Sequence, residues 1–230
     1  MSVDFKGAHY PKSVILYAVY FYVRYGVSYR DLEEIMEERG AEVDHATLNR
    51  WVVKFGSLMA AQAQSRKKPT AKSWRMDETY IKVKGRWVYY YRTVDKFGAV
   101  IDFYLSETRD EPAARAFFNK AINQHGLPEK VVIDKIGANA AALDTVNILL
   151  WLSGCMLFMI EELAVKYLNN IVEQSHRKVK GKMHQCLGWK SLEGVESTLA
   201  GVELWSMIKL GQMDTVETMT PWEQFYSLAA

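Results

Sequence analysis

The feature that most constrains this chain is a set of three closely spaced segments in which apolar and polar residues alternate. They span Ser73–Val83, Arg86–Val94 and Ala99–Leu105, are rich in aromatic residues, and are separated only by Lys84-Gly85 and by residues 95–98. Alternating segments joined by short turns that contain glycine are typical of antiparallel strands. The middle of the chain is therefore predicted to form a three-stranded antiparallel meander.

Helical and strand patterns then alternate toward the C-terminus. We expect a helix over Glu111–Gln124, a short buried strand over Lys130–Asp134, a helix within Asn139–Trp151, a strand over Cys155–Ile160, and helices over about Lys166–Lys182 and Ser191–Leu210. Antiparallel strands followed by this alternation predict an α/β fold with a mixed sheet.

The N-terminal residues carry instead the pattern of three helices. Ser13–Tyr25 is mostly apolar and stops at Gly26, Ser28 with Asp31 forms a capping box, and Asp44 caps the third helix. Two short helices joined by a tight link are typical of a helix-turn-helix, whose second helix enters the major groove of DNA. On that helix the candidate DNA contacts are His45, Thr47, Asn49 and Arg50, with Lys54 toward the phosphates. A plain three-helix packing unit with solvated polar residues fits the same pattern.

Composition excludes several classes of protein. With 49% hydrophobic and 24% charged residues, the 230-residue chain is globular rather than disordered or fibrous. Cys155 and Cys186 are too few for a disulfide scaffold or a zinc cluster and fit a reducing cytoplasm. The longest apolar run, Ile148–Ile160, is shorter than the roughly 18–20 residues that a membrane helix needs. No signal peptide is recognisable at the start, so we expect a cytoplasmic protein with no membrane partner.

Three carboxylates stand at positions that suit metal chemistry. Asp77 lies inside the first strand, where Asp is disfavoured, and Asp134 follows the buried KVVI strand. Glu173 is the one acid among six Lys and Arg between Lys166 and Lys190. Mg²⁺ and Mn²⁺ prefer oxygen ligands, and two such ions catalyse phosphodiester displacement. The alternative is that Asp134 caps a turn and that Glu173 and the cations form a solvated helix face.

Three ordered blocks of the chain resemble bacterial insertion-sequence transposases of the D-D-E type, most closely the IS-six (IS-twenty-six-like) group. They are MDETYIKVKGRWVYYYRTVDKFGAVIDFYLS, VVIDKIGANAAAL and KYLNNIVEQSHRKVKGKMHQCLGWKS, and the N-terminal region is similar to the family's helix-turn-helix. The resemblance implies a ribonuclease-H-like catalytic fold, a mixed sheet with flanking helices, preceded by an all-α domain. The expected division is a helix-turn-helix domain at 1–59, a linker at 60–72, the catalytic core at 73–190 and a C-terminal helical segment at 191–230.

The resemblance also implies an activity and its cofactors. Asp77, Asp134 and Glu173 would be the catalytic triad and ligate Mg²⁺ or Mn²⁺, with two ions expected. Arg177, Lys178, Lys180 and Lys182 would hold phosphates. The partners would be double-stranded DNA, both element ends and target, and further copies of the chain, as a dimer or larger assembly at the nucleoid.

The chain departs from the family pattern at a few positions. The 38-residue spacer between Asp134 and Glu173 is a few residues longer than usual, with extra length near Trp151–Val165. Asn49, Ile136 and Ser175 also differ from the usual residues. Two other functions remain open at this point: a non-catalytic DNA-binding protein derived from a transposase, and a ribonuclease-H-like nuclease.

Overall fold

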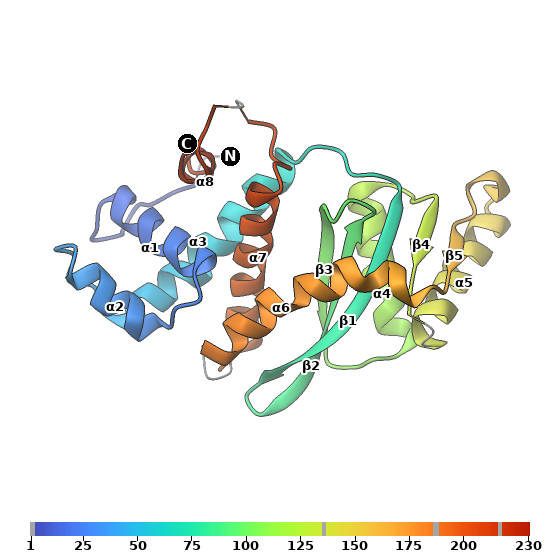
Figure 1. Cartoon of the computed structure of the whole chain (residues 1–230), viewed down its shortest axis with the longest axis horizontal. Coiled ribbons are helices and arrows are strands. Elements are labelled where there is room, and N and C mark those ends of the chain that lie inside the picture. The colour runs from blue at the N-terminus through green and yellow to red at the C-terminus, as the bar shows by residue number, and fades with distance from the viewer. Residues whose placement is uncertain (1–2, 135–136, 186–188, 216–217) are drawn as a thin grey trace. The chain divides into compact units, whose positions relative to one another are not determined.

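A computed structural model of the chain describes residues 3–134, 137–185, 189–215 and 218–230 (Figure 1). The elements in chain order are α1 (Lys12–Arg24), α2 (Tyr29–Glu37), α3 (His45–Ser65), β1 (Ser73–Val83), β2 (Arg86–Asp95), β3 (Val100–Ser106), α4 (Glu111–His125), β4 (Lys130–Val132), α5 (Gly137–Leu152), the 3-10 turn η1 (Met156–Phe158), β5 (Glu161–Leu163), the 3-10 turn η2 (Lys166–Asn169), α6 (Asn170–Gln185), α7 (Leu192–Lys209) and α8 (Pro221–Ser227).

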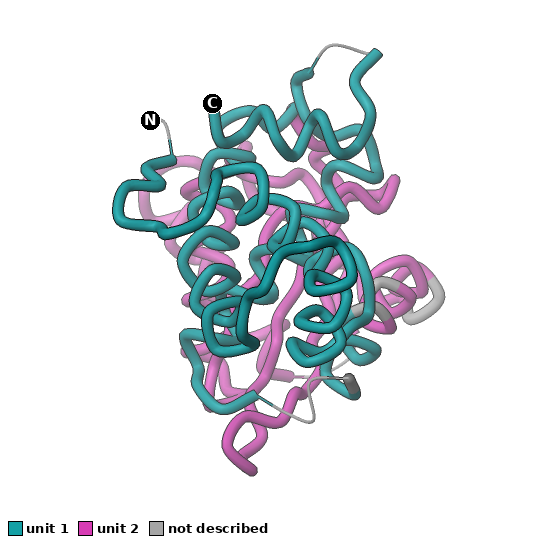
Figure 2. The backbone as a smooth tube through the Cα atoms, turned by 90° about the vertical axis from the view of Figure 1, so that its left-hand side faces the viewer, with its two compact units in different colours: residues 1–68, 179–230 teal, residues 69–178 magenta. Residues whose placement is uncertain are grey.

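The chain forms two compact units. One comprises residues 1–68 together with 179–230, and the other comprises residues 69–178 (Figure 2). The first unit is helical, and the second contains the sheet. Of the described helices, none is long and apolar enough to cross a membrane.

The sheet unit has the strand order β3-β2-β1-β4-β5. β1, β2 and β3 are antiparallel neighbours, whereas β4 runs parallel to β1 and β5 parallel to β4. Lys84 and Gly85 both have positive φ, 48° and 80°, which is the conformation of the tight hairpin turns whose twist matches that of paired strands. The predicted mixed sheet is therefore confirmed.

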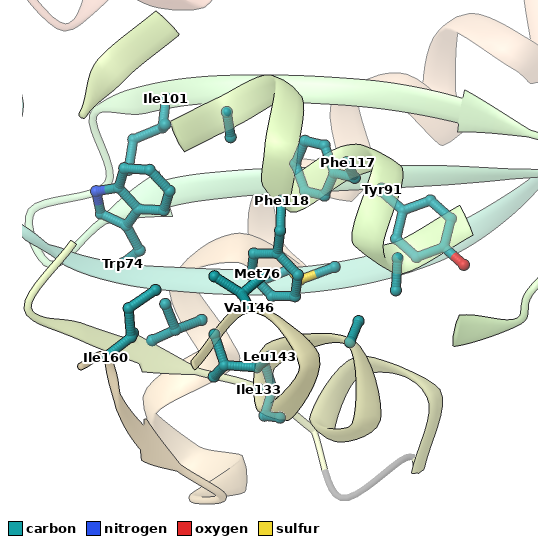
Figure 3. Close-up of a cluster of buried hydrophobic side chains, with 14 of the residues drawn as sticks. Trp74, Met76, Tyr91, Ile101, Phe117, Phe118, Ile133, Leu143, Val146 and Ile160 are labelled. Carbon is teal, nitrogen blue, oxygen red and sulfur yellow. The ribbon is translucent and has the colours of Figure 1, made fainter. Parts of the chain in front are cut away.

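Helices cover both faces of this sheet. α4 and α5 lie against one face, and the first half of α6 lies against the other (Figure 1). The core beneath α4 and α5 is built from alternate residues of β1, among them Trp74 and Met76, which meet Phe117 and Phe118 of α4 (Figure 3). Because successive side chains of a strand point to opposite faces, this alternation directs Asp77 away from the core cluster and toward the α6 side.

The helical unit begins with the predicted caps. Ser28 and Asp31 form a reciprocal capping box on α2, and the Asp44 side chain accepts hydrogen bonds from the backbone of α3. α7 packs along α3 and α1 at sites where glycine permits close approach. A Cβ at Gly201 would lie 2.5 Å from Val23 Cγ1, so only glycine fits this contact.

Three predicted segments differ from the structure. Residues 60–65, expected in the linker, continue α3, because AAQAQS consists largely of good helix formers. The strand expected over Cys155–Ile160 is instead a turn and η1, and the fifth strand follows at Glu161–Leu163. Residues 191–215 and 218–230 were expected to form a separate C-terminal segment, but α7 and α8 belong to the same unit as the N-terminal helices. Helix α8 was not predicted.

Candidate active site

Asp77 is the best-defined acid of the predicted triad. It lies in the middle of β1, opposite Arg92 of β2, and 16% of its side chain is exposed. His176 of α6 reaches the same carboxylate, with Nδ1 3.5 Å from Asp77 Oδ2. The imidazole is itself buried, and its ring lies 5.8 Å from that of Tyr90. β1 and α6 thus meet through a carboxylate and an imidazole at the face of the sheet opposite the hydrophobic core.

A side-chain hydrogen bond to the backbone of β1 anchors the same helix about two turns earlier. Asn169, just before α6, is buried and donates its side-chain N–H to the carbonyl of Met76, at 3.1 Å. Val172 of α6 is fully buried as well, whereas Glu173 is exposed. The start of α6 is therefore fixed to the strand residue that precedes Asp77.

The electrostatics link Asp77 to the other two acids. Burial, the largest cause, together with the negative charges of Glu78, Glu173 and Asp134, raises the pKa of Asp77 to about 7 from an ordinary value of 3.8. Asp134 is half-buried and directly follows Ile133 at the end of β4. The three acids come from separate sequence blocks, yet Glu173 and Asp134 both act on the Asp77 carboxyl.

The donor set suits a hard divalent cation. It consists of carboxylate oxygens, which Mg²⁺ and Mn²⁺ prefer, and their mutual repulsion is what a bound cation would relieve. In the described residues, no three His, Cys, Asp or Glu side chains are close enough together to hold a metal ion. The carboxylates would therefore have to move closer when an ion binds.

Sequence reasoning missed a second buried acid, Glu78. Only 3% of its side chain is exposed, and it projects from β1 on the face opposite Asp77. Arg109 donates through Nε, at 2.8 Å, and Nη2 to Oε1, while Asn139 donates to Oε2 at 2.7 Å. Because Asn139 lies in the first turn of α5, shortly after Asp134, this network ties β1 to the segment that carries Asp134. The only sequence signal was a second acid beside Asp77.

Comparison with known proteins identifies the family. A family model described as a DDE domain matches residues 71–212. The transposase for insertion sequence-like element IS431mec of Staphylococcus aureus is 37% identical over 199 residues, which are 86% of this chain and 85% of that protein. The transposase for insertion sequence element IS257 in transposon Tn4003, also from Staphylococcus aureus, is 36% identical over the same shares. The chain belongs to the DDE transposases of the IS-six group. The resemblance seen in its sequence is thus confirmed.

Solved structures include more distant matches to this transposase. The HTLV-2 integrase catalytic core domain in complex with magnesium (trimeric form) is 16% identical, with a TM-score of 0.43, and the match covers 69% of this chain and 97% of that one. A simian T-cell lymphotropic virus intasome chain gives a TM-score of 0.45 at 16% identity, covering 70% and 56% respectively.

All five predicted recognition residues lie on α3, and four of them are exposed. His45, Asn49, Arg50 and Lys54 of α3 are exposed. Thr47 is half-buried, because its hydroxyl donates to the capping carboxylate of Asp44 at 2.6 Å and accepts from Arg50 Nη2 at 2.6 Å. His45 Nδ1 lies 3.0 Å from Glu33 Oε2 of α2. Arg50 is thus held at the solvent-facing side of α3 by a chain of hydrogen bonds.

The basic residues of α6 divide into two groups. Arg177 and Lys180 are exposed, and the side chain of Lys178 lies outside the described part of the chain, as do Ile136 and the side chain of Ser175. Lys182, predicted to hold phosphates, is only 4% exposed. Its ammonium donates to the carbonyls of Tyr22, Tyr25 and Val27 at 2.7, 3.1 and 3.0 Å. The prediction for Lys182 was wrong, because its ammonium is buried and bound by backbone carbonyls at the C-terminal end of α1.

Proposed function

We propose that this transposase cleaves DNA at the ends of its insertion sequence and joins the freed 3′-hydroxyl to target DNA, with Asp77, Asp134 and Glu173 as the catalytic carboxylates. The observation that carries the proposal is the electrostatic effect of Glu173 and Asp134 on the buried carboxyl of Asp77. A buried carboxylate whose pKa is raised by neighbouring acids is unfavourable unless a cation or a proton joins it.

The three carboxylates would hold two Mg²⁺ or Mn²⁺ ions. When bound, such ions would activate the attacking oxygen and stabilise the leaving oxygen of an in-line displacement. The protein's own part is positioning. β1 fixes Asp77, the Glu78–Arg109–Asn139 network anchors the start of α5 beyond Asp134, and the Asn169 contact anchors the start of α6 before Glu173.

DNA binding would be shared between two sets of residues. On α3, His45, Asn49 and Arg50 would contact base edges, Thr47 would orient Arg50, and Lys54 would contact the phosphates. On α6, Arg177, Lys178 and Lys180 would hold phosphates near the catalytic acids. Joining two element ends to one target requires at least two copies of the transposase.

The decisive experiment is Asp134→Asn. Asn has nearly the volume of Asp but lacks the charge that a hard cation requires, so nicking should fall by at least about 100-fold. Binding to end DNA should be unchanged, because α3 lies in the other unit. The matched control is Asp144→Asn, an exposed acid on α5. Both proteins would be tested by gel shift with end DNA and by Mg²⁺-dependent nicking of the same DNA.

Each other outcome has a distinct meaning. Retained nicking in Asp134→Asn would remove Asp134 from the catalytic set, and loss of both binding and nicking would make its role structural. A wild type that binds ends but never nicks them would favour a non-catalytic DNA-binding protein derived from a transposase. Cleavage of RNA–DNA hybrids instead of end DNA would favour a ribonuclease-H-like nuclease.

A further inference from the structure

The sheet unit exposes eight large apolar side chains within one short segment, residues 148–159. Within it, the last turns of α5 and the adjoining 3-10 turn η1 form what we call the α5–η1 surface. Each of its eight side chains has between 49% and 97% of its area exposed: Ile148, Leu149, Trp151, Leu152, Met156, Leu157, Phe158 and Met159. α5 is therefore apolar on both sides, because Leu143 and Val146 of the same helix are buried in the core.

Hydrogen bonds hold this segment in a defined conformation. Gly154 adopts a φ of 79° as the helix ends, and the N–H groups of Gly154 and Cys155 donate to the carbonyls of Trp151 and Leu150, at 3.0 and 2.9 Å. The Asn147 side chain then closes the segment, donating to the carbonyl of Ile160 at 3.0 Å and accepting from its N–H at 2.8 Å. Because of these hydrogen bonds, the apolar side chains project from an ordered turn rather than from a frayed helix end.

The size and the charge of the surface limit what can cover it. Eight large side chains that are half-exposed or more leave roughly 100 Å² each, which approaches the ~800 Å² that each partner buries in a standard protein–protein interface. Residues 145–160 contain no Asp, Glu, Lys or Arg. DNA is a poor occupant, because binding to its phosphates depends on Lys and Arg.

We propose that the α5–η1 surfaces of two copies of this transposase meet around a two-fold axis and form a dimer. A two-fold interface places the same patch of both subunits face to face, so a charged patch would meet its own charge. An uncharged apolar patch causes no such repulsion, and its pairing with the same patch of a second copy buries apolar surface on both subunits. This dimer rests on the proposed function, because joining two element ends requires two copies. The α5–η1 surface would hold those two copies together.

Self-association of the full chain, without DNA or added metal, tests this dimer directly. Sedimentation analysis of the wild type at micromolar concentrations should show a dimer. Leu157→Asp should raise the dimer dissociation constant by at least about 100-fold, because two carboxylates would be buried at the interface, and Leu149→Lys serves as a second variant should the first fail to fold. Phe97→Asp, at an apolar residue that is 75% exposed in the β2–β3 turn, is the control and should leave the dimer unchanged.

Cross-linking identifies the surface itself. Cys155 is partly exposed in the turn between α5 and η1. In a Cys186→Ser background, a short bismaleimide should link Cys155 of two copies, and Leu157→Asp should abolish the link. A wild type that stays monomeric, a dimer indifferent to both surface variants, or a dimer that never cross-links through Cys155 would each overturn the proposal. A wild type that dimerises and cross-links this way but never nicks end DNA would refute the proposed function alone.

Discussion

Two buried charges, one in each unit, are held in opposite ways. The Lys182 ammonium of the helical unit has three carbonyl acceptors and lies 3.3 Å from the centre of the Tyr22 ring. The Asp77 carboxyl of the sheet unit is largely buried, with His176 Nδ1 at 3.5 Å, and burial together with the charges of other acids raises its pKa to about 7. The protein satisfies the first charge with its own groups, whereas burial and, after it, repulsion from other acids destabilise the second. A charge of the first kind stabilises the fold, and a charge of the second kind indicates a site built for a ligand.

The largest change in stability should come from removing the satisfied charge. Lys182→Met would leave the carbonyls at the end of α1 without their donor and remove a cation from a helix C-terminus. We expect the free energy of unfolding to fall by about 3–5 kcal/mol, the typical cost of breaking a buried charged interaction. Urea denaturation of the variant measures this loss.

Lys180→Met supplies the control for Lys182. Lys180 is exposed on the same helix, two residues earlier, so its replacement should change stability by no more than about 0.5 kcal/mol. Equal stability of the two variants would show that the carbonyl cage around Lys182 contributes little.

Glu78 offers a second satisfied charge, now within the sheet unit. Glu78→Gln would leave Arg109, whose side chain is 37% exposed, facing a neutral amide at the buried position 78, and we expect a loss of about 1–3 kcal/mol. Glu129→Gln breaks the exposed Lys72–Glu129 pair, whose side chains are 68% and 70% exposed, and should cost less than about 1 kcal/mol. If the two variants unfolded at the same urea concentration, the buried network would have no special weight in anchoring α5.

The Asp77 charge, which burial and neighbouring acids disfavour, should behave in the reverse sense, so that its removal stabilises the metal-free protein. The pKa of Asp77 is higher in the folded state, about 7, than its ordinary 3.8. The proton therefore contributes stability that is fully present below pH 3.8 and is lost as the pH rises through about 7. Asp77→Asn avoids this loss, so it should be more stable than the wild type at pH 8 by on the order of 1–3 kcal/mol.

Denaturation of both proteins at pH 4 and pH 8, in the presence of a chelator, measures this difference. The stabilisation by Asp77→Asn should be much smaller at pH 4, where the wild-type carboxyl is largely protonated. A variant that is less stable than the wild type at pH 8 would contradict the view that Asp77 is held at a cost to the fold.

Local signals predicted the elements around these charges, and tertiary contacts account for most of what was not predicted. The capping box of Ser28 and the Lys84-Gly85 turn depend on neighbouring residues, so both were visible in the sequence. The apolar run before Ile160 was predicted as a strand, because a short apolar segment does not reveal its conformation by periodicity. Lys182 was grouped with its basic neighbours, since nothing local indicates that the end of α1 lies beside it.

The same distinction applies to the acids. Asp77 stood out in the sequence because Asp is disfavoured within a strand. Glu78, beside it, was overlooked, because its partners Arg109 and Asn139 lie 31 and 61 residues away. The sequence therefore revealed an acid that could bind a ligand more clearly than an acid that stabilises the fold.

The smallest effect that we predict concerns Arg50, a charge at the surface of the helical unit. Its guanidinium donates to the Thr47 hydroxyl, which in turn donates to the Asp44 carboxylate at the start of α3. These bonds restrict the rotamers of Arg50, so less entropy is lost when it contacts a base. Arg50→Ala should reduce the preference for end DNA over random DNA by about 1–2 kcal/mol at a single salt concentration. Lys54→Ala, which would remove the proposed phosphate contact, should weaken binding to both DNAs equally. Fluorescence anisotropy with the two DNAs separates these effects, and an unchanged preference in Arg50→Ala would exclude this arginine from sequence recognition.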